Sequence, residues 1–250
     1  MIVRHFLQWV RTATAAERAD ATSALARAYL YSDLSADDRI AAEGALVMLL
    51  DDPSPLVRFA MAEALATSPD APPALILALV SDQVEIATLI IERSPLLLDA
   101  DLVDTAASRG PAIQTAIARR GELPCAVAAA LAEVGAAEAC LTLLENDSAE
   151  IADFSLDRIV ARHGHLAAIR EALLAREDLP MSTRQAVMVR LSETLANFVT
   201  ARAWMDEDRA NRVAKEACEK ATVTLAATSP GPDLRALVAH LRATGQLTAG

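Results

Sequence analysis

The residues best suited to metal chemistry are the two histidines of the segment His163-Gly164-His165. Two imidazoles in this spacing can bind zinc, but a zinc site needs three or four ligands. The nearest acidic residues, Asp153 and Asp157, are expected on the helix that precedes the histidines. Since a glycine is also common where a helix ends, the segment is explained as a hinge between two helices. We therefore expect no metal site here.

Acidic residues gather at two other places where paired carboxylates could act as a general acid and base. These places are Asp99, Asp101 and Asp104, and Asp206, Glu207 and Asp208. Both coincide with expected helix starts, where capping and the helix dipole favour carboxylates. The sequence contains no nucleotide-binding glycine loop, nucleophile elbow or zinc-protease motif. We expect no catalytic residues and no cofactor, and predict that the protein is not an enzyme.

Two further groups are candidates for binding another molecule. They are the pair Arg119 and Arg120, and the group Phe198, Trp204 and Met205. The arginines end a helix, where cations complement the dipole, and the alternative is a site for an anion or carboxylate. The aromatic group lies at the end of a long helix and belongs either to the core or to an exposed interaction surface, since Trp is enriched at binding hot spots.

The elements that position these residues are predicted to be helices. Alanine accounts for 55 residues and leucine for 34, whereas aromatic residues make up only 3% and there are 8 glycines. Alanine and leucine lose little freedom in a helix, and β-sheet folds need more β-branched and aromatic residues and more turn glycines. The chain is therefore predicted to be all-α.

Negative charge is concentrated in the middle of the chain. The net charge is −11, with −1 over residues 1–50, −12 over 51–180 and +2 over 181–250. An acidic surface opposes nucleic-acid backbones and anionic membranes. It is either a solvated face or a surface for a basic partner. We expect no nucleic acid and no membrane as partners.

Cysteine usage and the N-terminal residues bear on the cellular compartment. Cys125, Cys140 and Cys218 are isolated, which favours buried thiols in a reducing compartment. Polar residues interrupt the first ten positions, and no run of 18 apolar residues occurs. We expect a cytoplasmic protein.

A repeat of helix pairs follows from the turn signals. A Thr14–Glu17 capping box, a Ser35 cap and Pro55 in a first turn mark three helix starts. Helices are expected over residues 3–12, 15–31, 36–50, 55–66, 72–80, 99–107, 124–134, 136–145, 166–176, 182–203, 206–228 and 233–244, with others after the turns near 83, 110 and 148. Four polar turns are each followed by a β-branched residue that we expect in the core: Val57, Ile86, Ile113 and Ile151. Two helices per 30–40 residues predict an α-solenoid.

The unit that begins at Asp52 resembles a HEAT repeat, through Asp52, Val57-Arg58, Ala60 and Ala64-Leu65. In that family the turn aspartate and the helix arginine form a ladder from unit to unit. The later units carry Ala87, Gln114 and Ala152 where Arg58 stands. The resemblance therefore implies a ladder of a single rung at most.

Three segments resemble DUF2336, an uncharacterised bacterial family found mainly in alphaproteobacteria. They read LLDDPSPLVRFAMAEALATSPDAPPALILALVSD, RSPLLLDADLVDTAA and QTAIARRGELP, and the resemblance covers most of residues 40–165. The family implies no activity and no catalytic residues. The prediction is an α-solenoid of HEAT-like helical hairpins over residues 1–165, followed by a C-terminal bundle of longer helices over residues 166–250.

The C-terminal helices carry an apolar stripe that needs a partner: Val187, Leu191, Leu195, Phe198 and Val199. The next helix offers Val213, Ala217, Ala221 and Leu225, and the alternative is a homodimer. The leading functional hypothesis is a protein–protein interaction or adaptor module in bacterial regulation or signalling. The alternatives are an enzyme or nucleic-acid-binding protein on a HEAT-like scaffold, such as a DNA-glycosylase-like protein, and a homo-oligomeric structural module.

Overall fold

The computed structural model describes residues 9–10, 12–228 and 231–247, and within these ranges it contains fourteen helices longer than one turn and no strand. The all-α prediction is therefore confirmed. The helix expected over residues 3–12 lies mostly outside the described residues. The chain divides into two compact units, residues 1–127 and 128–250. The division at residue 165 stays a prediction.

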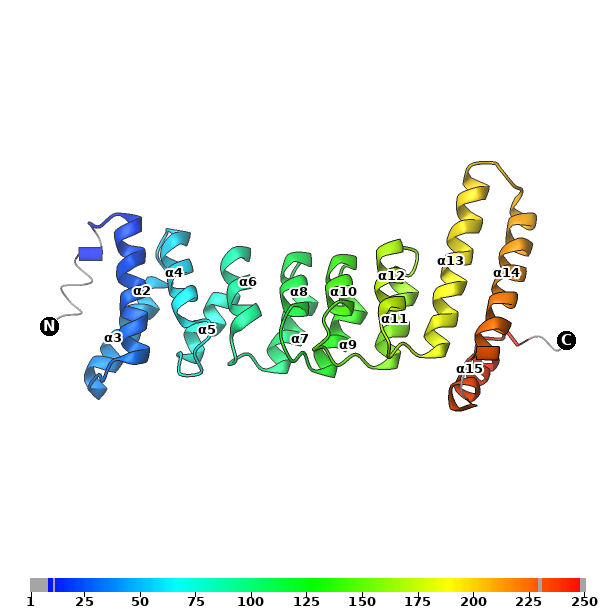
Figure 1. Cartoon of the computed structure of the whole chain (residues 1–250). Coiled ribbons are helices and arrows are strands. Elements are labelled where there is room, and N and C mark those ends of the chain that lie inside the picture. The colour runs from blue at the N-terminus through cyan, green and yellow to red at the C-terminus, as the bar shows by residue number, and fades with distance from the viewer. Residues whose placement is uncertain (1–8, 11, 229–230, 248–250) are drawn as a thin grey trace. The chain divides into compact units, whose positions relative to one another are not determined.

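In the first unit, alternate helices pack against one another. Helix α2 contacts α4, α4 contacts α6, and α6 contacts α8, while the helices between them contact their neighbours in sequence (Figure 1). The bounds are α2 (Ala15–Tyr31), α3 (Ala36–Leu49), α4 (Pro55–Leu65), α5 (Pro73–Val80), α6 (Val84–Arg93), α7 (Asp99–Ser108) and α8 (Pro111–Ala118). Helix α9 (Cys125–Val134) contains the boundary between the units.

The predicted helix starts are present in the first unit. The Glu17 amide donates to the Thr14 hydroxyl, and the Glu17 carboxylate accepts from the Thr14 amide at 2.8 Å, which completes the capping box. The Asp38 amide donates to the Ser35 hydroxyl at 3.1 Å. Pro55 is the first residue of α4, where its missing N–H costs nothing.

Three of the four predicted core residues occupy the same position in their helices. Val57, Ile86 and Ile113 are each the third residue of a helix and are 0–1% exposed. At this position the side chain lies against the helix packed beside it. The polar turn followed by a β-branched residue is thus a correct marker of the first buried position in α4, α6 and α8.

The prediction for Ile151 is wrong. Helix α11 (Asp153–His163) begins two residues later, and Ile151 lies before it and is only half-buried. The Asn146 side chain accepts from the Ser148 amide and hydroxyl at 3.0 and 2.7 Å, and this turn lengthens the loop. The third residue of α11 is Ser155, which is 1% exposed.

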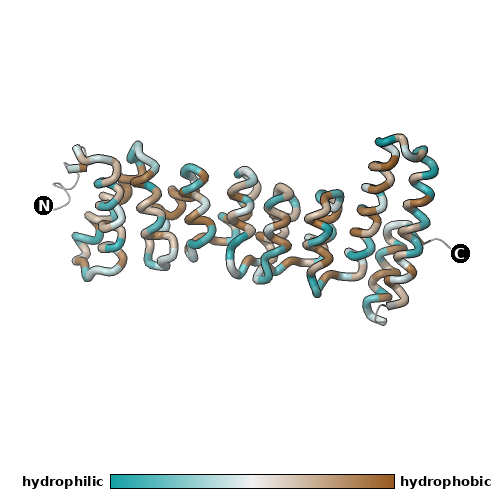
Figure 2. The backbone as a smooth tube through the Cα atoms, turned by 45° about the horizontal axis from the view of Figure 1, so that its top comes forward, coloured by the Kyte–Doolittle hydropathy of each residue, from teal (hydrophilic) through white to brown (hydrophobic). Residues whose placement is uncertain are grey.

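The second unit continues with shorter helices and ends with longer ones. Its bounds are α10 (Ala137–Leu144), α11, α12 (Ala167–Ala175), α13 (Met181–Ala201), α14 (Glu207–Thr228) and α15 (Gly231–Ala243). Helix α10 contacts α12, α11 contacts α13, and α13 contacts both α14 and α15. Apolar and polar residues alternate along these helices (Figure 2). The last helix, expected from residue 233, begins at Gly231.

Of the two alternatives left open for the apolar stripe, burial of the whole stripe against α14 is wrong. Val187 is 1% exposed, but Leu191, Leu195 and Phe198 are 38%, 55% and 45% exposed, and Val213 of α14 is 50% exposed. Helix α14 still contacts α13, and the buried residues of α13 are Thr183, Gln185, Val187 and Ala196. Most of the stripe is therefore left on the surface of α13.

No helix in the described ranges has both the length and the apolar composition required to cross a membrane.

Candidate functional site

The first unit contains two rungs of an aspartate–arginine ladder, so the expectation of a single rung is wrong. Arg18 of α2 donates from Nε and Nη2 to the Asp52 carboxylate at 2.7 and 2.8 Å. Arg58 of α4 donates in the same way to Asp82 at 2.6 and 3.0 Å. Each aspartate precedes the next helix of the layer, so each pair joins two neighbouring helices.

Arginine recurs as the fourth residue of a helix in both units. In four cases the guanidinium donates to a backbone carbonyl five or six residues upstream, in the loop before its own helix. These bonds are Arg18 to Ala13 at 2.9 Å, Arg58 to Asp52 at 2.5 Å, Arg170 to His165 at 2.8 Å and Arg184 to Leu179 at 3.2 Å. These arginines therefore hold the chain at helix starts and are structural.

The predicted arginine pair is engaged within the first unit. Arg120 donates to the carbonyl groups of Ile91 and Ser94, and burial lowers the pKa of its guanidinium. Arg119 is more exposed and forms an ion pair with Glu92 at 3.3 Å. Arg120 thus holds the end of α6, and Arg119 remains the more accessible of the two.

The predicted aromatic group lies at the end of α13, where Phe198 is, and in the loop that follows it, where Trp204 and Met205 are. Trp204 is 67% exposed, and its ring meets that of Phe198 edge-on at 5.7 Å. The Arg202 guanidinium lies 4.3 Å from the Phe198 ring centre and 5.4 Å from that of Trp204. Met205 is half-buried. The interpretation of Phe198 and Trp204 as core residues is therefore wrong.

The histidines and acidic clusters take part in local structure. His163 Nε2 lies 3.2 Å from the Gly135 carbonyl, and burial lowers the pKa of this imidazole. Asp101 accepts from the Leu98 amide and Asp206 from the Arg209 amide, as helix-capping carboxylates do. Over the described ranges, no three residues with metal-binding side chains come together.

The thiols are free in all three cysteines, and only Cys140 is fully buried. Cys125 and Cys218 are half-buried, which differs from the expectation.

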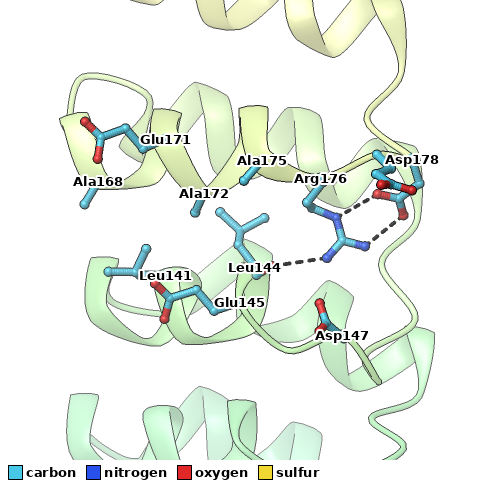
Figure 3. A pocket seen from close by; sticks show the side chains of 11 residues that line it. Leu141, Leu144, Glu145, Asp147, Ala168, Glu171, Ala172, Ala175, Arg176 and Asp178 are labelled. Atoms are coloured by element: carbon cyan, nitrogen blue, oxygen red, sulfur yellow. Dashed lines mark hydrogen bonds and ion pairs between the residues drawn. The ribbon is translucent and has the colours of Figure 1, made fainter.

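A cavity of about 730 Å³ lies between α10 and α12 in the second unit. Figure 3 shows the side chains of Ala168 and Ala172 on α12 facing Leu141 and Leu144 on α10. These side chains form an apolar floor. Charged residues surround it: Glu145, Asp147, Glu171, Arg176, Glu177 and Asp178. We call this feature the acidic groove.

The charges of the acidic groove are unevenly compensated. Arg176 donates to both oxygens of Asp178 at 3.0 and 2.8 Å and to the Leu144 carbonyl at 3.2 Å. This guanidinium lowers the pKa of the Asp178 carboxyl. The other four carboxylates are exposed, and none forms an ion pair within the described part of the chain. The groove therefore combines an apolar floor with uncompensated negative charge.

A comparison with protein families matches residues 86–250 to a family described as "Uncharacterised protein conserved in bacteria (DUF2336)". The chain belongs to the DUF2336 family. The DUF2336 match begins within α6 and includes the acidic groove, so the resemblance noted over residues 40–165 starts too early and stops too early. No curated protein and no solved structure matches the chain significantly.

The acidic groove of this DUF2336 protein was not predicted as a site from the sequence. The excess of acidic residues over 51–180 was visible, but it did not show which carboxylates share a cavity. The signal that could have found the groove is the pair of loops that contain Asp147 and Asp178, each just after a helix. Recognising it required the packing of α10 against α12.

Proposed function

We propose that this protein is a non-enzymatic, cytoplasmic protein-binding module whose acidic groove binds a basic segment of a partner protein. The observation that carries the proposal is the apolar floor between α10 and α12, with four carboxylates around it that have no ion-pair partner in the described chain. Such a surface suits a segment that alternates basic and small apolar residues.

An α-solenoid of HEAT-like hairpins is the architecture we propose for this module, with residues 166–250 as its C-terminal bundle. Contacts between alternate helices, and the two ion pairs that join α2 to α4 and α4 to α6, support it. Solenoids bind partners along continuous surfaces formed by successive hairpins.

The energy expected from the groove is moderate. An exposed ion pair contributes about 0.2–1 kcal/mol and weakens with salt. Four such pairs and an apolar contact are enough for a weak but specific complex, and an acidic surface also accelerates the approach of a basic partner. The same charge repels nucleic-acid backbones, which argues against the DNA-glycosylase-like alternative.

The test is a titration of the protein against a fluorescein-labelled peptide of six Lys-Ala repeats, followed by fluorescence anisotropy at 50 and 200 mM NaCl. The variant Glu145→Gln/Glu171→Gln/Glu177→Gln removes three charges from the acidic groove. A matched control, Glu63→Gln/Glu85→Gln/Glu216→Gln, removes three exposed charges elsewhere.

We expect the groove variant to bind the peptide about 5- to 30-fold more weakly, from about 1–2 kcal/mol of lost ion pairing. The control variant should change the affinity less than twofold. Equal effects of the two variants would show that only net charge matters and would refute the site. Salt-dependent binding of a 20-base-pair DNA duplex would favour the nucleic-acid alternative instead.

A second candidate function is self-association through the exposed residues of α13 and the following loop. Leu191, Leu195, Phe198 and Trp204 form an apolar surface that α14 leaves uncovered. A twofold dimer brings the same patch of both subunits together. The apolar stripe of one copy, with Arg202 at its end, can therefore cover the same stripe of the other copy. We propose a second copy of this chain as its occupant.

Multi-angle light scattering from 5 to 200 μM tests this candidate. A dimer is expected for the native chain, and Leu195→Ser/Trp204→Ser should shift it to the monomer mass. A monomer at every concentration would refute self-association and leaves the acidic groove unaffected, because the two surfaces share no residue.

A further inference from the structure

We propose that the pocket between α13, α14 and α15 binds an uncharged small molecule that has an apolar body and a hydrogen-bond donor, such as a medium-chain alcohol or primary amide. The acidic groove and the exposed residues Phe198 and Trp204 do not line this pocket. The proposal therefore goes beyond the protein-binding function.

The pocket has a volume of about 580 Å³ and lies entirely within the second unit. This volume is in the range of ligand-binding pockets. Its apolar surface comes from small and medium side chains of all three helices and the residues after α15: Val189, Ala196, Ala214, Cys218, Val223, Leu241 and Leu247. This is the face of α13 that lies beneath α14, and the small side chains there leave the space open.

The observation that points to a ligand is the buried amide of Gln185, which lines the pocket and is 1% exposed. Its Nε2 donates to Gln246 Oε1 at 2.5 Å. Its Oε1 is buried and has no hydrogen-bond partner in the structure. A buried carbonyl oxygen without a donor costs about 1–3 kcal/mol, so a molecule that supplies an O–H or N–H at this point is favoured.

The other polar groups at the pocket indicate that the ligand is uncharged. The Glu193 carboxylate accepts from Arg190 at 2.9 Å, and Lys215 lies 3.9 Å from Glu219. Each charge at the rim therefore has an opposite charge beside it. Burial raises the pKa of the Cys218 thiol, which keeps this group neutral. A charged ligand would lose its hydration without gaining a free counter-charge.

The chemistry of the occupant follows from these three features. An apolar chain fills the space between Val189, Ala196 and Ala214. A hydroxyl or primary amide at its end donates to Gln185 Oε1. No covalent step is involved, so the pocket acts by binding alone.

Alkylation of Cys218 by N-ethylmaleimide provides a direct assay, because this thiol lines the pocket and is half-buried. The rate is followed for each cysteine by peptide mass spectrometry on the full chain. The probes are 1-octanol, its isomer methyl heptyl ether, which has no donor, and octanoate, which is charged. Cys125 does not line the pocket and serves as an internal control.

We expect 1-octanol to slow alkylation of Cys218 in a saturable manner and to leave Cys125 unchanged. The ether and octanoate should require at least fivefold higher concentrations. Gln185→Met keeps the length of the side chain and removes the acceptor, so it should weaken 1-octanol about fivefold and leave the ether unchanged. Ala214→Leu fills the pocket and should abolish protection by every probe.

Thermal melting checks that Gln185→Met and Ala214→Leu fold. If only one of the two variants folds, that variant is enough for the test. Three results would overturn the proposal. One is equal protection by the alcohol and the ether, which would mean that neither probe donates a hydrogen bond to Gln185. Another is undiminished protection in Ala214→Leu. The third is no protection of Cys218 by 1-octanol at its solubility limit.

Discussion

Replacing Arg58 with methionine is expected to destabilise the first unit by about 2–3 kcal/mol. The guanidinium donates twice to Asp82, at 2.6 and 3.0 Å, and once to the Asp52 carbonyl at 2.5 Å. Hydrogen bonds to charged groups contribute about 1.5–3 kcal/mol, and breaking a fully buried ion pair costs about 3–5 kcal/mol. The Arg58 and Asp82 side chains are each 13% exposed, so solvent reduces the cost below that upper range. Methionine retains the apolar part of the arginine stem.

Urea unfolding followed by circular dichroism at 222 nm measures the effect, since urea does not screen charges as guanidinium does. A double-mutant cycle with Asp82→Asn isolates the contribution of the pair. Arg158→Met is the matched control. Arg158 binds Glu133 at 2.7 Å through two nitrogens, but these side chains are 46% and 59% exposed, so a loss below about 1 kcal/mol is expected.

The reasoning is refuted if Arg58→Met costs no more than Arg158→Met. It is also refuted if the cycle gives a coupling energy near zero, because the loss would then come from packing and not from the ion pair.

Three further predictions concern groups within single units. The hydrogen bond from Arg18 lowers the pKa of Asp52. In Asp82 burial raises the pKa, but the hydrogen bonds from Arg58 and the Gln83 amide outweigh it, so its pKa is also below the ordinary value of 3.8. The stabilisation by these two carboxylates is complete above pH 3.8 and is lost as the pH falls through their folded-state pKa values. The urea concentration at the unfolding midpoint should therefore decrease when the pH is lowered below about 4. In Asp52→Asn this midpoint should depend less on pH. Ser155→Ala removes a buried hydroxyl that has no hydrogen-bond partner and should raise the free energy of unfolding by up to about 1 kcal/mol in urea melts; a loss above 1 kcal/mol would contradict this. Burial raises the pKa of the Cys140 thiol to about 11, so N-ethylmaleimide at pH 8 should alkylate Cys140 at least tenfold more slowly than Cys218, with equal rates in 8 M urea.

Helix positions could be predicted from the sequence where the signal is local. Thr14 with Glu17, and Pro55, mark helix starts because a cap or a proline acts within one turn. The same logic placed Ile86 and Ile113 in the core. It failed at Ile151, because the Asn146 side chain stabilises a turn that competes with the helix start.

Features that depend on packing could not be predicted. Arg18 binds Asp52, which is 34 residues away with α3 between them in the sequence, and no local pattern reports that contact. The sequence also left open whether α14 buries the apolar stripe of α13, and only the structure showed that Leu191, Leu195 and Phe198 are exposed. The pocket beside Gln185 exists only because α14 packs over small residues of α13. The sequence left open whether Phe198 and Trp204 are buried or exposed, and their exposure came from the structure.

The ladder of α2, α4 and α6 has a consequence for folding kinetics. Its ion pairs join residues only 34 and 24 positions apart, and the main helix contacts of the first unit join elements at most two apart in the chain. The relative contact order of the first unit is therefore low, and low contact order accompanies rapid folding. Because each rung joins only neighbours, breaking the Arg58–Asp82 pair should lower amide hydrogen-exchange protection most in α4 and α6, with a progressively smaller effect toward α2.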